Sequence, residues 1–245
     1  MPFTFSHPAL VLLIALLPRR WYSLTGLVAG ASVPDFDYFI WLSIKSKYGH
    51  TWPGILYFDI PVGIVLTFLF HYVVRNALVA NSPRFVQVRF GHLQSFSWGQ
   101  HFTRRWPVVL ACIAIGAASH LFWDAFTHLK GAFVQAMPVL QTNLHFGAYP
   151  WPLYNVLQHA STLAGGLVVL WAVWRVPVSS PISRKPDWRY WALLVAVVGA
   201  VIAIRVTTIR YYQVDNMIIV IAMSGTMLGL LLVPLLMKML GWGTG

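Results

Sequence analysis

The chain has 245 residues, of which 58% are hydrophobic and only 9% are charged, and this excludes an ordinary soluble domain, in which roughly a quarter of residues are charged. Its formal net charge of +11 could indicate a nucleic-acid-binding protein, but the 17 Lys and Arg residues are scattered at the ends of apolar stretches and form no basic module. The charge instead predicts contact with a lipid bilayer and its anionic headgroups, and no nucleic-acid partner is expected.

Two short or broken apolar helices are predicted at the N-terminus. Residues 8–17 form an apolar run that is too short to cross a bilayer and long enough for a re-entrant or half-spanning helix. Arg19 and Arg20 follow this run instead of preceding it, which is the wrong order for a cleaved signal peptide. Residues 21–44 form a second apolar segment, which is interrupted at Pro34.

Five further apolar stretches are long enough to span a hydrocarbon core about 30 Å thick, which takes about 20 helical residues. They cover residues 54–74, 106–126, 155–175, 189–209 and 217–237. Residues 75–105 are polar and aromatic and are expected to be interfacial, and residues 127–154 form a neutral, aromatic loop. We therefore predict an all-α, polytopic transmembrane helix bundle with about five full spans plus the two short or broken N-terminal helices.

The sequence predicts a single membrane domain over residues 1–245. Its residues 1–175 carry the helices of a candidate metal site, and residues 176–188 form a proline-rich linker. Residues 189–240 contain two accessory transmembrane helices without a candidate ligand. Nothing in the sequence predicts an oligomeric state.

The distribution of basic residues orients the predicted bundle. With alternating spans, twelve of the 17 Lys and Arg residues fall on one side. The other side receives Lys45, Lys47, Lys130, Arg205 and Arg210. The richer side is predicted to be cytoplasmic, in a prokaryotic cytoplasmic membrane. Because no histidine enters this assignment, it can be compared independently with the positions of candidate ligands.

Carboxylates and imidazoles are the residues that could carry chemistry. All six acidic residues are Asp, and four lie within or beside apolar helices, where an unpaired charge is costly: Asp35, Asp37, Asp59 and Asp124. Nine histidines are also present. Imidazole with carboxylate is a common ligand set for zinc and related divalent ions, so a metal site is one way to stabilise these carboxylates.

The most informative pattern lies near the end of the second long span. His120, Asp124 and His128 follow one another at four-residue steps and therefore share one face of a helix. The two histidines are roughly 12 Å apart along the axis, which is awkward for one ion with bonds of about 2 Å. Two ions bridged by Asp124, about 3.5–4 Å apart, fit this spacing better. The alternative is a polar helix face that packs against other helices.

Further candidates precede the first long span. Pro34 can place Asp35 at the start of a new helix, where a single oxygen acceptor would suffice as a cap. Capping does not require the second carboxylate, Asp37. We therefore take Asp35 as a candidate ligand and Asp37 as a candidate orienting carboxylate or general base. His50 would be an ordinary loop histidine without these neighbours. Asp59 could orient a ligand, act as the base, or be a hydrogen-bonded structural carboxylate.

Two more histidines complete the candidate set. His7 precedes a proline and is expected at the mouth of the first short helix, and His159 opens the third long span. On the topology given by the basic residues, seven candidate metal ligands fall near the outer face: His7, Asp35, His50, His120, Asp124, His128 and His159. Histidines with unrelated structural roles would have no reason to fall on the same side of the membrane. The remaining ones that face the cytoplasm are expected to pack or to lie at the interface: His71, His92 and His101.

The motifs that contain these residues resemble the motifs of known protein families. An integral-membrane family of unknown function opens with Pro-Phe-Thr-x-Ser-His-Pro-Ala, which the chain matches over Pro2–Ala9. That family resembles the YdjM-type inner-membrane proteins, which are described as metal-dependent hydrolases. Further matching patches are Pro34–Tyr38, Gly49–Thr51, His120–His128 and Gln158–His159.

More distantly, the order His, Asp, His, His-x-x-x-Asp, His, His is similar to the ligand order of zinc-dependent phospholipase C and P1-type nucleases. Those enzymes are all-helical and hold three zinc ions, and the resemblance implies that the seven candidates are metal ligands with Asp124 bridging. They also use an N-terminal amino group and a late acidic ligand. Here Met1 lies six residues before His7 and the chain has no Glu, so one or two ions are expected, either zinc or manganese.

The leading hypothesis is a membrane-embedded metal-dependent hydrolase that acts on a phosphoester, such as a phospholipid or a lipid-linked phosphate, at the extracytoplasmic face. The ions would activate a bound water, and Lys45, Lys47 and Lys130 could attract the phosphate. One alternative is a metal-binding or transport protein without hydrolysis. Another is a structural protein whose His and Asp side chains hold helices together.

Overall fold

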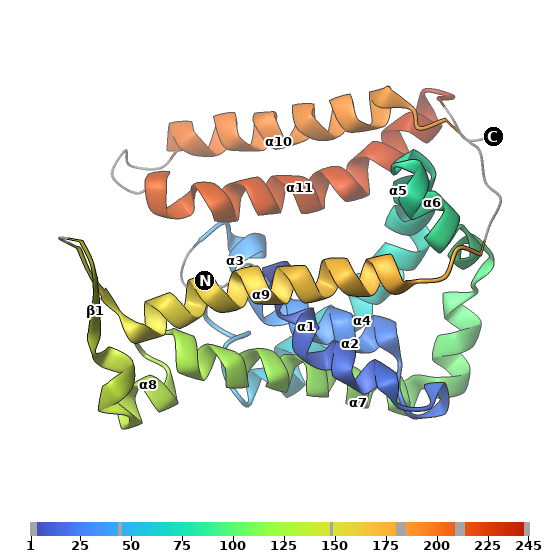
Figure 1. Cartoon of the computed structure of the whole chain (residues 1–245). Helices are drawn as coiled ribbons and strands as arrows, with labels where there is room; N and C mark the ends of the chain where they lie inside the picture. The colour runs from blue at the N-terminus through green and yellow to red at the C-terminus, as the bar shows by residue number, and fades with distance from the viewer. Residues whose placement is uncertain (1–3, 44–45, 148, 180–184, 209–213, 243–245) are drawn as a thin grey trace. The chain divides into compact units, whose positions relative to one another are not determined.

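The computed structural model describes residues 4–43, 46–147, 149–179, 185–208 and 214–242 (Figure 1). Within these described ranges, five helices are long and apolar enough to cross a membrane: Ile55–Asn81, Trp98–Ala136, Leu153–Arg175, Trp188–Thr208 and Met217–Met239. Each overlaps one of the five predicted spans. Apart from one two-stranded hairpin, the described elements are helical, so the prediction of an all-α bundle is confirmed.

The contacts within the chain divide it into two compact units. Unit 1 contains Met1–Asp35, Tyr48–Ile64 and Arg105–Arg175. Unit 2 contains Phe36–Lys47, Val65–Arg104 and Val176–Gly245. The predicted single membrane domain stays a prediction. All seven candidate ligands belong to unit 1.

Unit 1 starts with short helical turns, as the sequence predicts. Four of them precede the first longer helix: η1 (Thr4–Ser6), α1 (Pro8–Val11), η2 (Leu12–Leu16) and η3 (Arg19–Trp21). Helix α2 (Leu24–Ser32) begins at Ser23, whose hydroxyl oxygen accepts the Gly26 N–H at 3.3 Å. It ends in the 3-10 turn η4 (Val33–Asp35), so the predicted interruption at Pro34 is confirmed.

The first long span is not a uniform α-helix. It is built from η5 (Ile55–Asp59), α4 (Ile60–Leu69), η6 (Phe70–Val74) and α5 (Arg75–Asn81). Both η5 and η6 are π-helical turns, which are rare and are found frequently at functional positions. Asp59 ends η5 and is fully buried, and His71 lies buried in η6.

In unit 1, helix α7 (Trp98–Thr127) packs so closely against α2 that their backbones are in contact. Its non-helical residue Arg105, two residues before Pro107, marks a kink in the helix and is the first α7 residue of unit 1. A Cβ atom on Gly116 of α7 would lie 2.5 Å from the Leu27 carbonyl oxygen, and one on Gly30 of α2 would overlap the Ile113 carbonyl. The absence of side chains at both glycines therefore lets the two helices touch.

The segment between α7 and the third span is more ordered than the loop expected at 127–154. It forms α8 (Ala132–Ala136), η8 (Pro138–Gln141) and the antiparallel strands β1 (Asn143–Phe146) and β2 (Tyr149–Pro152). Helix α9 (Leu153–Arg175) follows directly. It docks on η1, where the Ser6 hydroxyl donates to the Thr162 carbonyl at 2.8 Å.

Unit 2 contains the two accessory spans and several short helices. Its short elements, besides η6 and α5, are α3 (Phe36–Trp41), α6 (Arg84–Phe90) and η7 (Gly91–Ser95). Helices α10 (Trp188–Thr208) and α11 (Val214–Met239) pack along each other. Buried Tyr190 and Leu194 of α10 meet Val233 and Met237 of α11 in an apolar cluster.

The contact between α2 and α7 yields a prediction. We expect Gly30→Ala to lower stability by about 1–3 kcal/mol, because the new methyl group must displace the Ile113 backbone. Gly199→Ala is the matched control, since a Cβ there meets nothing within 4 Å, and it should change stability by less than about 1 kcal/mol. Thermal unfolding in detergent measures both. Equal effects of the two variants would contradict backbone contact at Gly30.

Candidate metal centre

Six of the seven candidate ligands gather in unit 1, although they come from separate parts of the chain. His7 precedes α1, Asp35 ends η4, His50 lies in the loop before η5, and His120, Asp124 and His128 lie on or directly after α7. Six nitrogen–oxygen distances of 3.4–3.7 Å join them. The face shared by His120, Asp124 and His128 therefore meets the other three residues.

His120 is oriented by a backbone carbonyl. Its Nδ1 lies 2.8 Å from the Ala31 carbonyl oxygen. A carbonyl can only accept, so Nδ1 carries the proton and donates it, and Nε2 faces the two carboxylates of Asp35 and Asp124. A histidine held in this way by its second nitrogen is the usual arrangement of a metal ligand.

Asp35 is held through one of its two oxygens. The Thr4 hydroxyl donates to Oδ2 at 2.5 Å, and both side chains are buried. The other oxygen, Oδ1, faces His50 Nε2 at 3.4 Å and His120 Nε2 at 3.6 Å. Thr4 therefore leaves a single Asp35 oxygen to face the histidines.

Asp124 connects two pairs of histidines. Its Oδ2 lies 3.4 Å from His120 Nε2 and 3.6 Å from His50 Nε2. Its Oδ1 lies 3.7 Å from His7 Nε2 and 3.5 Å from His128 Nδ1. Because the two oxygens face different histidines, this carboxylate has the arrangement expected of a bridge between two ions.

The separations themselves are informative. A charged imidazole that donates to a carboxylate lies at about 2.7–2.9 Å, so distances of 3.4–3.7 Å are too long for such a bond. Neighbouring ligand atoms around a tetrahedral ion with bonds of about 2.0–2.1 Å are about 3.3–3.4 Å apart. Among the described residues, no hydrogen bond reaches His7 Nε2, His120 Nε2 or Asp124 Oδ1, all of which are buried.

In the part of the chain that the structure describes, two overlapping groups of three could hold a metal ion, with ligand atoms within 4.8 Å of one another. They are His7 with Asp35 and His120, and His50 with His120 and Asp124. Both groups contain His120, the side chain with the firmest orientation. The donor set of imidazole and carboxylate suits zinc, and manganese also accepts it.

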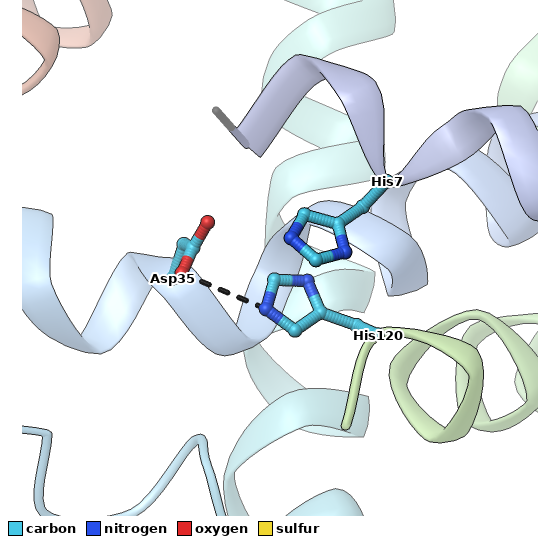
Figure 2. Close-up of side chains that lie close together, drawn as sticks. All are labelled: His7, Asp35 and His120. Carbon is cyan, nitrogen blue, oxygen red and sulfur yellow. Dashed lines mark ion pairs between the residues drawn. The ribbon is translucent and has the colours of Figure 1, made fainter. Parts of the chain in front are cut away.

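His7 lies directly over His120. Their rings are stacked with centroids 3.6 Å apart and planes 14° apart, and Asp35 points at the His120 ring (Figure 2). Burial and the neighbouring His120 lower the pKa of His7 to about 3, so its imidazole is neutral and offers a lone pair. Burial alone would raise the pKa of Asp35, but His120 and His50 outweigh it and hold the pKa below its ordinary value.

The loop that carries His50 depends on glycine and threonine. A Cβ on Gly49 would lie 2.5 Å from the Pro34 carbonyl oxygen, so glycine allows the loop to touch the backbone next to Asp35. Thr51 fixes the loop beyond His50, because its hydroxyl donates to the Tyr48 carbonyl and accepts the Gly54 N–H, each at 3.0 Å. The Gly-His-Thr sequence thus has a role for each residue.

The cluster is buried at one side and open at the other. The side chains of His120, His7 and Asp35 are at most 2% exposed. Exposure rises through Asp124 and His50 to 31% at His128. A small molecule would therefore approach from the side of His50 and His128.

His128 and His159 differ from the other candidates. His128 Nδ1 also lies 3.2 Å from the Asp124 backbone carbonyl, which favours a hydrogen bond that steadies the end of α7. The structure does not bring His159 into the two groups of three: its exposed ring packs against Trp151 at 5.4 Å. Helix α9 contributes to the site instead through Ser6, which it holds next to His7.

The other predicted residues have separate surroundings. Asp37 belongs to unit 2, where its Oδ2 accepts from the Ser46 hydroxyl at 2.7 Å and the Lys47 N–H at 2.5 Å. The Lys47 ammonium lies over the Trp41 ring, 5.4 Å from its centroid. Lys130 is exposed two residues beyond His128, and Lys45 lies outside the described residues.

Two contributors escaped the sequence analysis. Thr4 was visible only as part of the opening octet, one helical turn before His7, where its hydroxyl could have been recognised as a partner for a carboxylate. The Ala31 carbonyl carries no side-chain signal at all. Both act on the orientation of the candidate ligands.

These features define a multi-pass helical membrane protein with a buried His–Asp cluster in one of its compact units. A family model described as "Domain of unknown function (DUF4184)" matches residues 1–235, so the chain belongs to that family. Among curated proteins and solved structures, none shows significant similarity to the chain.

The role of Thr4 can be tested by metal affinity. If the cluster binds zinc, we expect Thr4→Val to weaken that binding by about 10- to 100-fold, because the carboxylate of Asp35 loses the hydroxyl that orients it. Thr4→Ser keeps the hydroxyl and should bind as tightly as the wild type. Competition with a chromophoric chelator measures both affinities. Wild-type affinity in Thr4→Val would contradict an orienting role.

Proposed function

We propose that this protein is a membrane-embedded metal-dependent hydrolase that cleaves a phosphoester of a phospholipid or lipid-linked phosphate at the extracytoplasmic face. The observation that carries the proposal is the set of four separations between Asp35, Asp124 and the Nε2 atoms of His50 and His120. All four are 3.4–3.6 Å, too long for charged hydrogen bonds and close to the spacing of ligands around one ion.

The residues suggest positions for one or two ions. His50, His120 and Asp124 would hold the first, and Asp35 Oδ1 faces the same two histidines. Asp124 Oδ1 and His7 would face the second. Zinc is the ion we favour and manganese the alternative. A bound ion would supply a water of lowered pKa as nucleophile and would polarise the phosphoester oxygens.

The protein's own groups then serve binding and orientation. Thr4 and the Ala31 carbonyl fix Asp35 and His120, so that little rearrangement accompanies the reaction. Lys130, two residues beyond His128 in unit 1, would attract a phosphate. Asp59 remains our candidate for an orienting carboxylate or general base, whereas Asp37 belongs to unit 2 and is not included in the proposed centre.

Sequence and composition support the proposed location. The basic residues favour the extracytoplasmic side for the candidate ligands, since the side poorer in Lys and Arg faces outward. The cluster lies near the C-terminal end of the unit 1 part of α7, within a span-length helix. A substrate with its phosphate at the headgroup level could therefore be reached without being extracted from the bilayer.

Elemental analysis of the purified protein tests the metal site. Wild type is expected to retain stoichiometric zinc or manganese, and Asp124→Asn should lose it, because the neutral amide is a poor metal ligand and cannot bridge two ions. Asp187→Asn is the matched control: Asp187 accepts the Arg189 N–H in unit 2, and asparagine can do the same. If the wild type contains no bound metal, even after reconstitution with divalent ions, the result would contradict the proposal.

Hydrolysis is tested separately. Wild type in nanodiscs should cleave a fluorogenic phospholipid or, more slowly, bis-p-nitrophenyl phosphate; activity should disappear with a strong chelator and return with zinc or manganese. Stoichiometric metal without hydrolysis of any phosphoester in a panel of lipids would favour the non-catalytic alternative. Measurement of metal flux into proteoliposomes would then test transport.

A further inference from the structure

The hairpin of β1 and β2 has two chemically different faces. In its antiparallel register, Leu144 pairs with Trp151 and Phe146 pairs with Tyr149. Residues directly opposite each other, and residues two apart along a strand, lie on the same face of a sheet. These four apolar or aromatic side chains therefore share one face, which we call the aromatic face. The other face carries Asn143, His145, Pro150 and Pro152.

The aromatic face is exposed in the structure. Its pair at the base, Leu144 and Trp151, is 40% and 41% exposed, and its pair at the tip, Phe146 and Tyr149, is 58% and 74% exposed. The base is tied down, because Trp151 packs against the His159 ring of α9. Four large apolar side chains that face outward side by side are unusual on a surface in water and mark a contact surface.

The surroundings of the hairpin indicate what covers this face. From Gly131 to Trp174 the sequence contains no Lys, Arg, Asp or Glu, so neither the hairpin nor its flanks offer a charge to an ionic partner. Strand β2 continues without a break into α9, which is long and apolar enough to span a membrane. Tyr and Trp at the end of a span, here Tyr149 and Trp151, are typical of the boundary between lipid and water.

The hairpin also lies at the end of unit 1 where α8 follows α7 and where α9 begins (Figure 1). The ends of two span-length helices therefore meet there, which is where a bilayer surface would lie. His128, the most exposed residue of the His–Asp cluster, directly follows α7 at the same end.

We propose that the aromatic face of the hairpin inserts into the headgroup boundary of the lipid bilayer. The tip residues Phe146 and Tyr149 reach the acyl chains, and the opposite face with His145 remains toward water. If the proposed hydrolase function holds, this contact keeps the open side of the metal centre at headgroup level and selects bilayer lipids over soluble phosphoesters. The membrane contact itself needs neither metal nor activity.

Site-specific labelling tests the contact. The chain has one cysteine, Cys112, which is buried, so Phe146→Cys and His145→Cys can be made in a Cys112→Ser background and labelled with an environment-sensitive fluorophore. Serine keeps an acceptor for the Ser23 N–H, which Cys112 Sγ now accepts. If that background folds poorly, the wild-type thiol can remain, since it is shielded from the label. The proteins are placed in nanodiscs of phosphatidylcholine and phosphatidylglycerol.

The two labels sit next to each other in β1 on opposite faces, so each is the control for the other. We expect lipids with a nitroxide on the acyl chain to quench the label at position 146 severalfold more than the label at 145, and aqueous iodide to show the reverse order. Equal quenching of both labels by iodide would place the face in water and overturn the proposal. Protection of position 146 from both quenchers would overturn it in favour of a second copy or another protein.

A double substitution gives an independent readout. Phe146→Ser with Tyr149→Ser should leave the metal content unchanged and lower the rate on nanodisc phospholipid severalfold more than the rate on bis-p-nitrophenyl phosphate. Asn143→Ser with His145→Ser, on the opposite face, should leave both rates unchanged. Lipid quenching at position 146 without any hydrolysis would support the membrane contact and contradict the hydrolase function. Hydrolysis without lipid quenching would support the hydrolase function and contradict the membrane contact.

Discussion

Two carboxylates, Asp35 and Asp124, lie among histidines in a part of the chain that is otherwise apolar, and this constraint organises unit 1. A carboxylate removed from water needs compensation by charge or by short hydrogen bonds. Asp35 receives one short bond from Thr4, and the imidazoles of His50 and His120 compensate its other oxygen in part, from 3.4 and 3.6 Å. A divalent ion shared among these atoms would supply the missing compensation, which is why the spacing matters more than the residue types.

The scaffold that creates this spacing is made largely of backbone. Gly30 and Gly116 let α2 touch α7, and that contact brings the Ala31 carbonyl to His120 Nδ1. Gly49 does the same for the loop of His50, which lies on the Pro34 backbone. Small residues therefore position the large polar ones, and their lack of a side chain is what makes the cluster compact.

In the same unit, the His–Asp cluster is buried at one side and partly exposed at the other. His120 and His7 are stacked and buried, whereas His128 is partly exposed at the end of α7. The uncharged segment that follows folds into a hairpin with one aromatic face and leads directly into α9. A metal centre, a bilayer contact and a membrane-spanning helix would then adjoin one another within one compact unit.

The sequence alone determined those features that depend on local pattern. The five spans follow from apolar length, and the break at Pro34 follows from proline chemistry. The shared face of His120, Asp124 and His128 follows from the period of a helix, and the structure retains it.

Tertiary structure decided which residues come together and at what distance. It brought His7 and His50 to the α7 residues, left His159 against Trp151, and formed a hairpin where the sequence indicated only a neutral loop. The physical reason is that such distances depend on backbone contacts at small residues and on carbonyl acceptors. Neither leaves a periodic side-chain pattern that the sequence alone could reveal.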